Sequence, residues 1–188
     1  MPPIMIRNSS ARTRSEEAEA LAKVGIELAQ RGKLNDALAI FDKAIKADER
    51  CVKAWNAKGV ALESLERFDE ALAAYETAIG LSPKDGKARC NKGNVLSAMG
   101  RDDEAILAYD AALKCEPRDA DAWCNRGRSL AMLGKFEDAV PSFEKALEID
   151  GSSPDAWHSL GVALLRLGQN ARAEHCFAKE GECHEGAG

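Results

Sequence analysis

A spacing of 34 residues runs through most of this chain and constrains its fold more than any other feature. Trp123 and Trp157 lie one interval apart, and Trp55 lies two intervals before Trp123. Three further columns keep this register without an insertion: Gly25, Gly59, Gly93, Gly127 and Gly161; Ala37, Ala71, Ala105, Ala139 and Ala173; Phe41, Tyr75, Tyr109, Phe143 and Phe177. A fixed period of this length indicates an array of stacked repeats.

We divide the repeated part into five units, which span residues 18–51, 52–85, 86–119, 120–153 and 154–187. In each unit, apolar residues recur at helical spacing in two stretches, which predicts two helices joined by a turn. The turns contain glycines suited to a left-handed helix end, namely Gly32, Gly100, Gly134 and Gly168. Polar residues after the turns predict N-caps of the second helices, at Asn35, Asp69 and Asp103.

Packing explains the repeated columns. A glycine such as Gly59 has no side chain, so the two helices of a hairpin can approach closely, and Trp55 and Tyr75 fill the remaining space. One hairpin cannot bury its own apolar stripe, so neighbouring hairpins stack and share a continuous core.

These columns resemble the tetratricopeptide repeat (TPR), which has the same period. In the second unit the matching residues are Trp55, Lys58, Gly59, Leu62, Ala71, Tyr75, Ala78 and Pro83. The resemblance covers residues 18 to about 180 and is closest to the multi-TPR proteins of prokaryotes. It implies an all-α fold, a right-handed α-solenoid of five TPR helix-turn-helix repeats with ten antiparallel-paired helices.

The residue before the repeated glycine departs from the family pattern, which usually has leucine there. The chain has Lys58, Lys92 and Arg126 at this position, whereas Val24 and Leu160 keep it apolar. Acidic residues follow the aromatic column at Asp42, Glu76, Asp110 and Glu144. Two arrangements are open: the basic heads turn towards these acids, or they extend into solvent.

Both ends of the array are atypical, as terminal repeats are expected to be. We expect residues 1–17 to form a flexible N-terminal segment before the first repeat. The fifth repeat, residues 154–180, is degenerate and predicted to cap itself, because Glu180 and Gly181 replace small and apolar residues. Residues 181–188 are predicted to form a loose tail.

Composition excludes several classes of protein. The 188 residues include 26 basic and 31 acidic side chains, a net charge of −5, which argues against a nucleic-acid binder. Apolar runs stay below the roughly 18 residues that a membrane helix needs, so no membrane association is expected. The six cysteines form no CxxC pair, which favours the reducing cytoplasm.

The motifs of common enzymes are missing from the sequence. It contains no glycine-rich phosphate loop, no HExxH and no GxSxG, so we expect neither an enzyme nor a cofactor. His175, Cys176, Cys183 and His184 form the one cluster of metal-ligating residue types, and their spacing fits no common zinc pattern. No metal site is predicted.

The resemblance implies a protein-protein interaction scaffold that binds a peptide or partner protein in a concave groove, which the first helices of the repeats line. Mapped onto this chain, the groove residues are Lys53, Asn56, Lys87, Asn91, Asn94, Asn125 and Arg128. The lysines favour acidic residues or a terminal carboxylate, and asparagine can both donate to and accept from a peptide backbone.

Family members that bind chaperone C-termini use a carboxylate clamp of lysine, asparagine and arginine. Starting from the second unit, the corresponding places hold Asn56, Val60, Asn91, Asp121 and Asn125, and the other registers match no better. No chaperone-type clamp is therefore expected. Two alternative functions remain at this point: self-association through the open ends of the array, and a non-catalytic accessory subunit of an enzyme complex.

Overall fold

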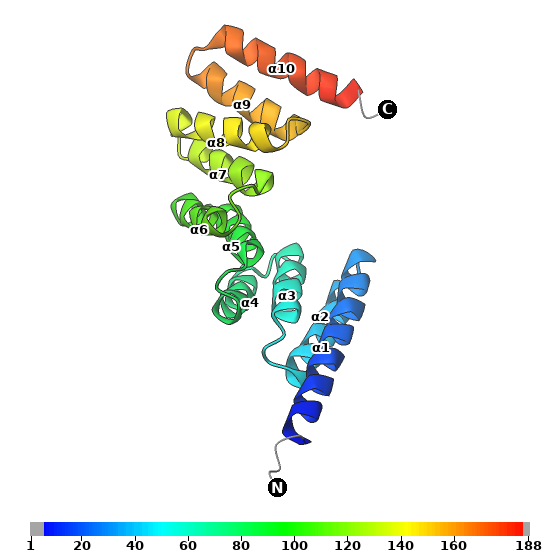
Figure 1. Ribbon diagram of the computed structural model, residues 1–188. Coiled ribbons are helices and arrows are strands. Elements are labelled where there is room, and N and C mark those ends of the chain that lie inside the picture. Colours follow the sequence, from blue (N-terminus) through cyan, green and yellow to red (C-terminus); the bar gives the residue numbers. More distant parts are fainter. Residues whose placement is uncertain (1–5, 186–188) are drawn as a thin grey trace. The chain divides into compact units, whose positions relative to one another are not determined.

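A computed structural model describes residues 6–185, which are entirely α-helical apart from turns and loops (Figure 1). Ten helices follow one another along these residues: α1 (Ile6–Gln30), α2 (Leu34–Ala47), α3 (Val52–Ser64), α4 (Phe68–Leu81), α5 (Gly86–Ala98), α6 (Asp102–Cys115), α7 (Ala120–Met132), α8 (Phe136–Ile149), α9 (Pro154–Arg166) and α10 (Asn170–Glu185). They pair sequentially as helix-turn-helix repeats, which confirms the predicted all-α fold. The chain divides into two compact units, Met1–Val95 and Leu96–Gly188.

The turn inside each repeat ends its first helix with a left-handed residue. Gly32, Gly100, Gly134 and Gly168 have φ angles of 73–75°, as the sequence predicts. After Gly134, the backbone N–H of Lys135 donates to the carbonyl of Leu130 at 2.9 Å, which satisfies a free carbonyl at the end of α7. In the second repeat a non-glycine residue, Glu66, adopts this conformation with a φ of 58°.

The predicted N-caps of the second helices are wrong. Asn35, Asp69 and Asp103 lie inside the first turns of α2, α4 and α6. The cap positions belong to Lys33, Arg67 and Arg101, which form no side-chain capping bond. The left-handed turn fixes where the next helix starts, so Asp69 and Asp103 lie within its first turn. There their negative charges interact favourably with the positive end of the helix dipole.

Side-chain caps occur instead where a new repeat begins in the second unit. Asp119 Oδ1 accepts a hydrogen bond from the backbone N–H of Ala122 at 3.0 Å, at the start of α7. Ser153 Oγ does the same for Ala156 at 3.3 Å, at the start of α9. These two loops therefore set the entry of the chain into its next hairpin.

An aromatic ring lies directly against a glycine in the first, second, fourth and fifth hairpins. In the first unit, a Cβ atom added to Gly59 would lie 2.5 Å from Cε1 of Tyr75, whose side chain is fully buried. In the second unit, a Cβ atom added to Gly127 would lie 2.7 Å from Cε1 of Phe143. Because these rings occupy the space of a Cβ, only glycine allows the two helices to approach this closely.

Ion pairs connect successive repeats, which confirms that the basic heads turn towards the acids of the preceding repeat. Lys58 Nζ lies 2.7 Å from Asp42 Oδ1, and Lys92 Nζ lies 2.9 Å from Glu76 Oε1. In the second unit, the Nε–H of Arg126 donates to Asp110 Oδ1 at 2.7 Å. Each pair joins the first helix of one repeat to the second helix of the repeat before it.

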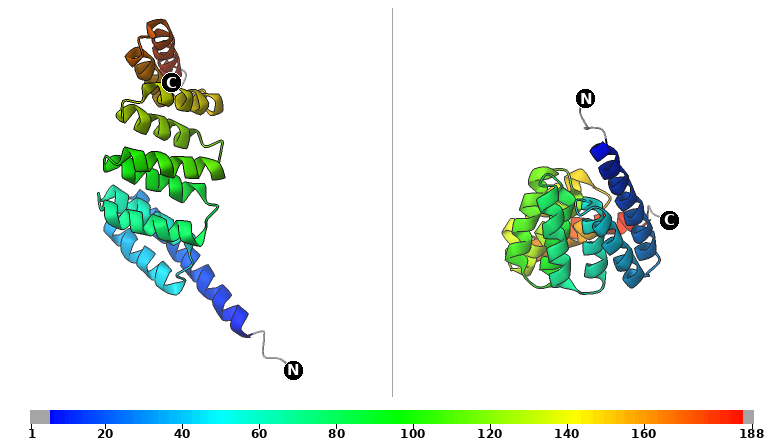
Figure 2. Two further views of the ribbon diagram at one scale, coloured as in Figure 1. Left: turned by 90° about the vertical axis from the view of Figure 1, so that its left-hand side faces the viewer. Right: turned by 90° about the horizontal axis from the view of Figure 1, so that it is seen from below.

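The terminal helices are longer than expected. α1 begins at Ile6, so residues 6–17 extend this helix beyond its partner α2 instead of forming a separate flexible segment (Figure 2). α10 likewise continues to Glu185, through most of the predicted tail. These stretches contain no proline, and the single glycine at 181 costs only about 1 kcal/mol. Residues 1–5 and 186–188 of the two predicted segments lie outside the described part.

None of the helices between residues 6 and 185 combines the length and the apolar character that crossing a membrane requires.

We predict that Gly59→Ala lowers the free energy of unfolding by about 1–3 kcal/mol, because the methyl group would overlap the buried ring of Tyr75. Gly80→Ala in α4 is the matched control: no atom lies within 4 Å of its added Cβ, so better helix propensity should raise stability by about 0.5–1 kcal/mol. Urea denaturation followed by circular dichroism measures both. Equal effects of the two substitutions would contradict the packing explanation.

We further predict that Glu66→Gly stabilises the protein by about 1 kcal/mol, because glycine adopts a positive φ without the strain that a side chain adds. Gly100→Ala places a side chain on the equivalent turn of the third repeat and should destabilise the protein by a similar amount. Thermal melts of both variants test this. A lower melting temperature for Glu66→Gly would show that the Glu66 side chain has a stabilising contact.

Candidate functional site

The first unit contains a groove formed by α1, α3 and α5, with a volume of about 490 Å³. Its lining residues are Ile26, Ala29, Gln30, Leu34, Phe41, Lys53, Asn56, Ala57, Val60, Ala61, Ser64, Lys87 and Asn91. Val60 is 45% exposed although it is apolar, whereas Leu62 on the same helix is 1% exposed. The groove therefore offers an apolar surface to water between polar side chains.

Four of the seven groove residues expected from the sequence line this one groove: Lys53, Asn56, Lys87 and Asn91. Asn91 Nδ2 donates to Asn56 Oδ1 at 3.3 Å, which links α5 to α3. Each amide keeps further donor or acceptor capacity, since one such bond uses only part of it. This pair can therefore present hydrogen-bonding groups to a ligand.

The two lysines give the groove a positive rim. Both Lys53 and Lys87 are exposed, and neither forms an ion pair with another residue of the described chain. The other lysines of α3 and α5 behave differently, because Lys58 and Lys92 are paired with acids of the preceding repeat. A negatively charged group entering the groove would therefore meet two cations without displacing an existing partner.

The remaining three expected residues lie elsewhere. Asn94 is half-buried on α5 and does not line the groove. Asn125 and Arg128 lie on α7 in the second unit, where Arg128 Nη1 donates to Asn125 Oδ1 at 3.4 Å.

Their neighbour Cys124 is buried, and burial raises the pKa of its thiol although the charge of Arg128 acts in the opposite direction. Cys124 is therefore a protonated thiol at neutral pH, without nucleophilic reactivity.

Sequence reasoning placed Val60 on the concave face but missed Ile26, which extends the apolar part of the groove. A usable signal existed: Ile26 and Val60 occupy the same repeat position, immediately after the glycine, where the next two units have Asn94 and Arg128. An apolar residue at a position that is polar in other repeats indicates a surface with its own role.

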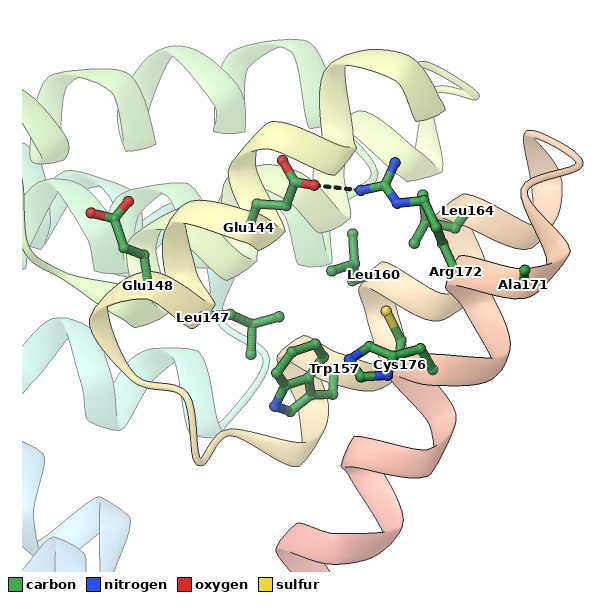
Figure 3. Close-up of a pocket in the computed structure, with 10 residues that line it drawn as sticks. Glu144, Leu147, Glu148, Trp157, Leu160, Leu164, Ala171, Arg172 and Cys176 are labelled. Carbon is green, nitrogen blue, oxygen red and sulfur yellow. Dashed lines mark hydrogen bonds and ion pairs between the residues drawn. The ribbon is translucent and has the colours of Figure 1, made fainter.

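The second unit contains another groove, of about 550 Å³, between α8, α9 and α10 (Figure 3). It is lined by Glu144, Leu147, Glu148, Trp157, Leu160, Leu164, Ala171, Arg172, His175 and Cys176. Two residues of the possible metal cluster, His175 and Cys176, thus lie in this groove. Among the side chains that the structure describes, no three potential ligands converge on a metal position; the side chain of His184 is not among them.

Several solved structures have a similar fold. MamA from Desulfovibrio magneticus RS-1 matches with a TM-score of 0.80 at 21% identity, covering 90% of this chain and 96% of that one. PilF from Pseudomonas aeruginosa gives a TM-score of 0.84 at 21% identity, covering 91% and 78%. YrrB, a TPR protein with an unusual peptide-binding site, gives 0.70 at 23% identity, covering 87% and 84%. At these identities the likeness concerns the fold.

Sequence comparison identifies the family. A tetratricopeptide repeat family matches residues 25–86 and 90–154, and a second family of the same repeat matches residues 142–175. A comparison with curated proteins found no match. The matched segments cover most of the chain and agree with the helical pairs of the structure. The chain therefore belongs to the tetratricopeptide repeat family.

Proposed function

We propose that this protein is an interaction scaffold whose groove on α1, α3 and α5 holds an extended segment of a partner protein. The observation that carries the proposal is the composition of that groove, where apolar residues such as Val60 lie between two unpaired lysines and a pair of asparagines. TPR proteins generally bind other proteins and are typically not catalysts. The peptide-binding site reported for YrrB supports a peptide as the ligand.

The groove favours a particular kind of segment. An aspartate, glutamate or terminal carboxylate would lie near Lys53 and Lys87, and an apolar side chain would cover Ile26 and Val60. The amides of Asn56 and Asn91 suit the backbone of an extended peptide, which presents donors and acceptors whatever its sequence. We extend the proposal to Asn94, Asn125 and Arg128 as contacts of a longer partner. We also place the protein in the cytoplasm, because its six cysteines are scattered along the sequence without a CxxC pair.

Self-association through the C-terminal end of the array is less well supported. The positions on α10 that correspond to Val140 and Leu147 of the fourth repeat hold Glu174 and Gly181. Both are exposed, and Phe177 is only half-buried, unlike the fully buried Tyr75. A second copy stacking on this face would bury a charge and gain little apolar contact.

Selection from a random dodecapeptide library displayed on phage tests the proposed function. We expect the enriched peptides to combine an acidic group with an apolar residue. For such a peptide, Lys53→Glu with Lys87→Glu should weaken binding at least about tenfold, because reversed charges repel the acid. Fluorescence anisotropy of the labelled peptide measures the dissociation constants.

The matched control carries the same change of charge on the same unit. Lys43→Glu with Lys46→Glu alters two exposed lysines of α2 that do not line the groove, and should leave the affinity within about twofold. An equal loss of peptide affinity in both double variants would show that the change of net charge, and not the groove, causes the effect. Enriched peptides that bind the Lys53→Glu, Lys87→Glu variant as tightly as the wild type would exclude the groove as their site.

A further inference from the structure

Three basic side chains on first helices reach back to an acid on the second helix of the preceding repeat. In the second repeat, the Lys58 side chain extends from α3 to Asp42 of α2, and Nζ of Lys58 lies 2.7 Å from Oδ1 of Asp42. Its ammonium lies 5.6 Å from the centre of the Trp55 ring. Lys92 reaches Glu76 in the third repeat. In the fourth, the Arg126 guanidinium lies 5.9 Å from the Trp123 ring and also donates to Ser142 Oγ.

The fifth repeat breaks this pattern. Its residue at the same position is Leu160, which is 4% exposed and has a shorter, uncharged side chain. Trp157 occupies the place of Trp55 and Trp123, so the aromatic floor is kept although the basic residue at position 160 is missing; the acid of this repeat, Glu144, is paired with Arg172 of α10 instead. The groove between α8, α9 and α10 lies where the basic stem lies in the other repeats (Figure 3).

Both the floor and the rim of this groove suit a basic side chain. Leu147, Trp157 and Leu160 form an apolar floor that can cover methylene groups. Glu144 and Glu148 also line the groove; the carboxylate of Glu144 lies beside it, and that of Glu148 points outward (Figure 3). The edge-on contact of His175 with Trp157, at 6.3 Å between ring centres, helps to hold the indole in position.

The two carboxylates already have partners from this chain, but at exposed positions. Arg172 Nη2 lies 2.7 Å from Glu144 Oε1, and Lys145 Nζ lies 2.6 Å from Glu148 Oε2. All four side chains are about half exposed or more, so these pairs are weak and exchange readily. A carboxylate can therefore accept a second cation that is also held by the aromatic ring.

We propose that this groove binds a lysine or arginine side chain of a partner protein. Its stem lies across Leu160 and its charged head takes the place over Trp157 that Lys58 and Arg126 take over their own tryptophans. A purely apolar side chain would cover the same floor but would leave the carboxylates and the negative face of the indole unused. The site differs from the proposed peptide groove in location and in the sign of charge that it prefers.

The three tryptophans allow a direct test in the intact chain. Butylguanidinium is the probe, and the indole Nε1–H signals of Trp55, Trp123 and Trp157 are followed by ¹⁵N-resolved NMR after assignment by single Trp→Phe variants. We expect a saturable shift at Trp157 with a dissociation constant on the order of millimolar, as for one isolated side chain. Trp55 and Trp123 should shift at least about fivefold less, since Lys58 and Arg126 already cover them.

Leu160→Lys should abolish the saturable shift, because it supplies the missing cation from within, as in the second repeat. Val162→Lys adds the same charge at an exposed position of α9 outside the groove and should leave the shift unchanged. Three outcomes would overturn the proposal: equal shifts at all three indoles, an equal saturable shift with uncharged butanol, or binding by Leu160→Lys as in the wild type. The wild-type comparisons decide the matter even if that variant fails to fold.

Discussion

The contact between a glycine backbone and an aromatic ring, which is present in the first, second, fourth and fifth hairpins, is the constraint on which the rest of the structure depends. The ring of Tyr75 occupies the space that a Cβ of Gly59 would need, and it is completely buried there. This close approach lets a short three-residue turn join two helices of nearly equal length.

Ion pairs then join one hairpin to the next. In three places the acid after an aromatic residue meets the basic residue before the next glycine, as Asp42 meets Lys58. Stability in such arrays is approximately a sum of the terms within repeats and those between neighbours. Because the same contacts recur, the repeated columns carry the fold and hold no information about a ligand.

Function therefore depends on positions where the repeats differ. Val60 is apolar where the next two repeats have polar side chains, and this gives the first groove its apolar floor. Leu160 replaces a lysine or arginine, and the space it leaves forms the second groove. In both cases a single side chain gives its repeat a surface that differs from that of its neighbours.

Much of this could be predicted from the sequence. The columns that include Gly59 and Tyr75 fix the number of repeats and the pairing of helices, because packing geometry leaves no alternative. The charges before the glycines were also visible, but the direction of a flexible stem such as Lys58 is decided only by its neighbours. The N-cap at Asp69 was wrong because the turn closes by backbone bonds that involve no side chain.

The candidate site was predictable only in part. Lys53 and Asn56 lie on one helix face and could be assigned from the repeat pattern, whereas the contribution of Ile26 depends on how α1 packs beside α3. A groove is space that side chains leave open, and its volume depends on their lengths and rotamers. This explains why the groove beside Leu160 could not be recognised from the substitution alone.

The central claim is that the groove on α1, α3 and α5 receives the partner, and site-specific photocrosslinking tests it most directly. Benzoylphenylalanine is placed at Val60 in the groove or at Leu107, which is 68% exposed on α6. Each protein is then irradiated with a library-selected dodecapeptide and analysed by mass spectrometry. We predict a covalent adduct from position 60 and none from position 107. An adduct from position 107 with none from position 60 would contradict the account.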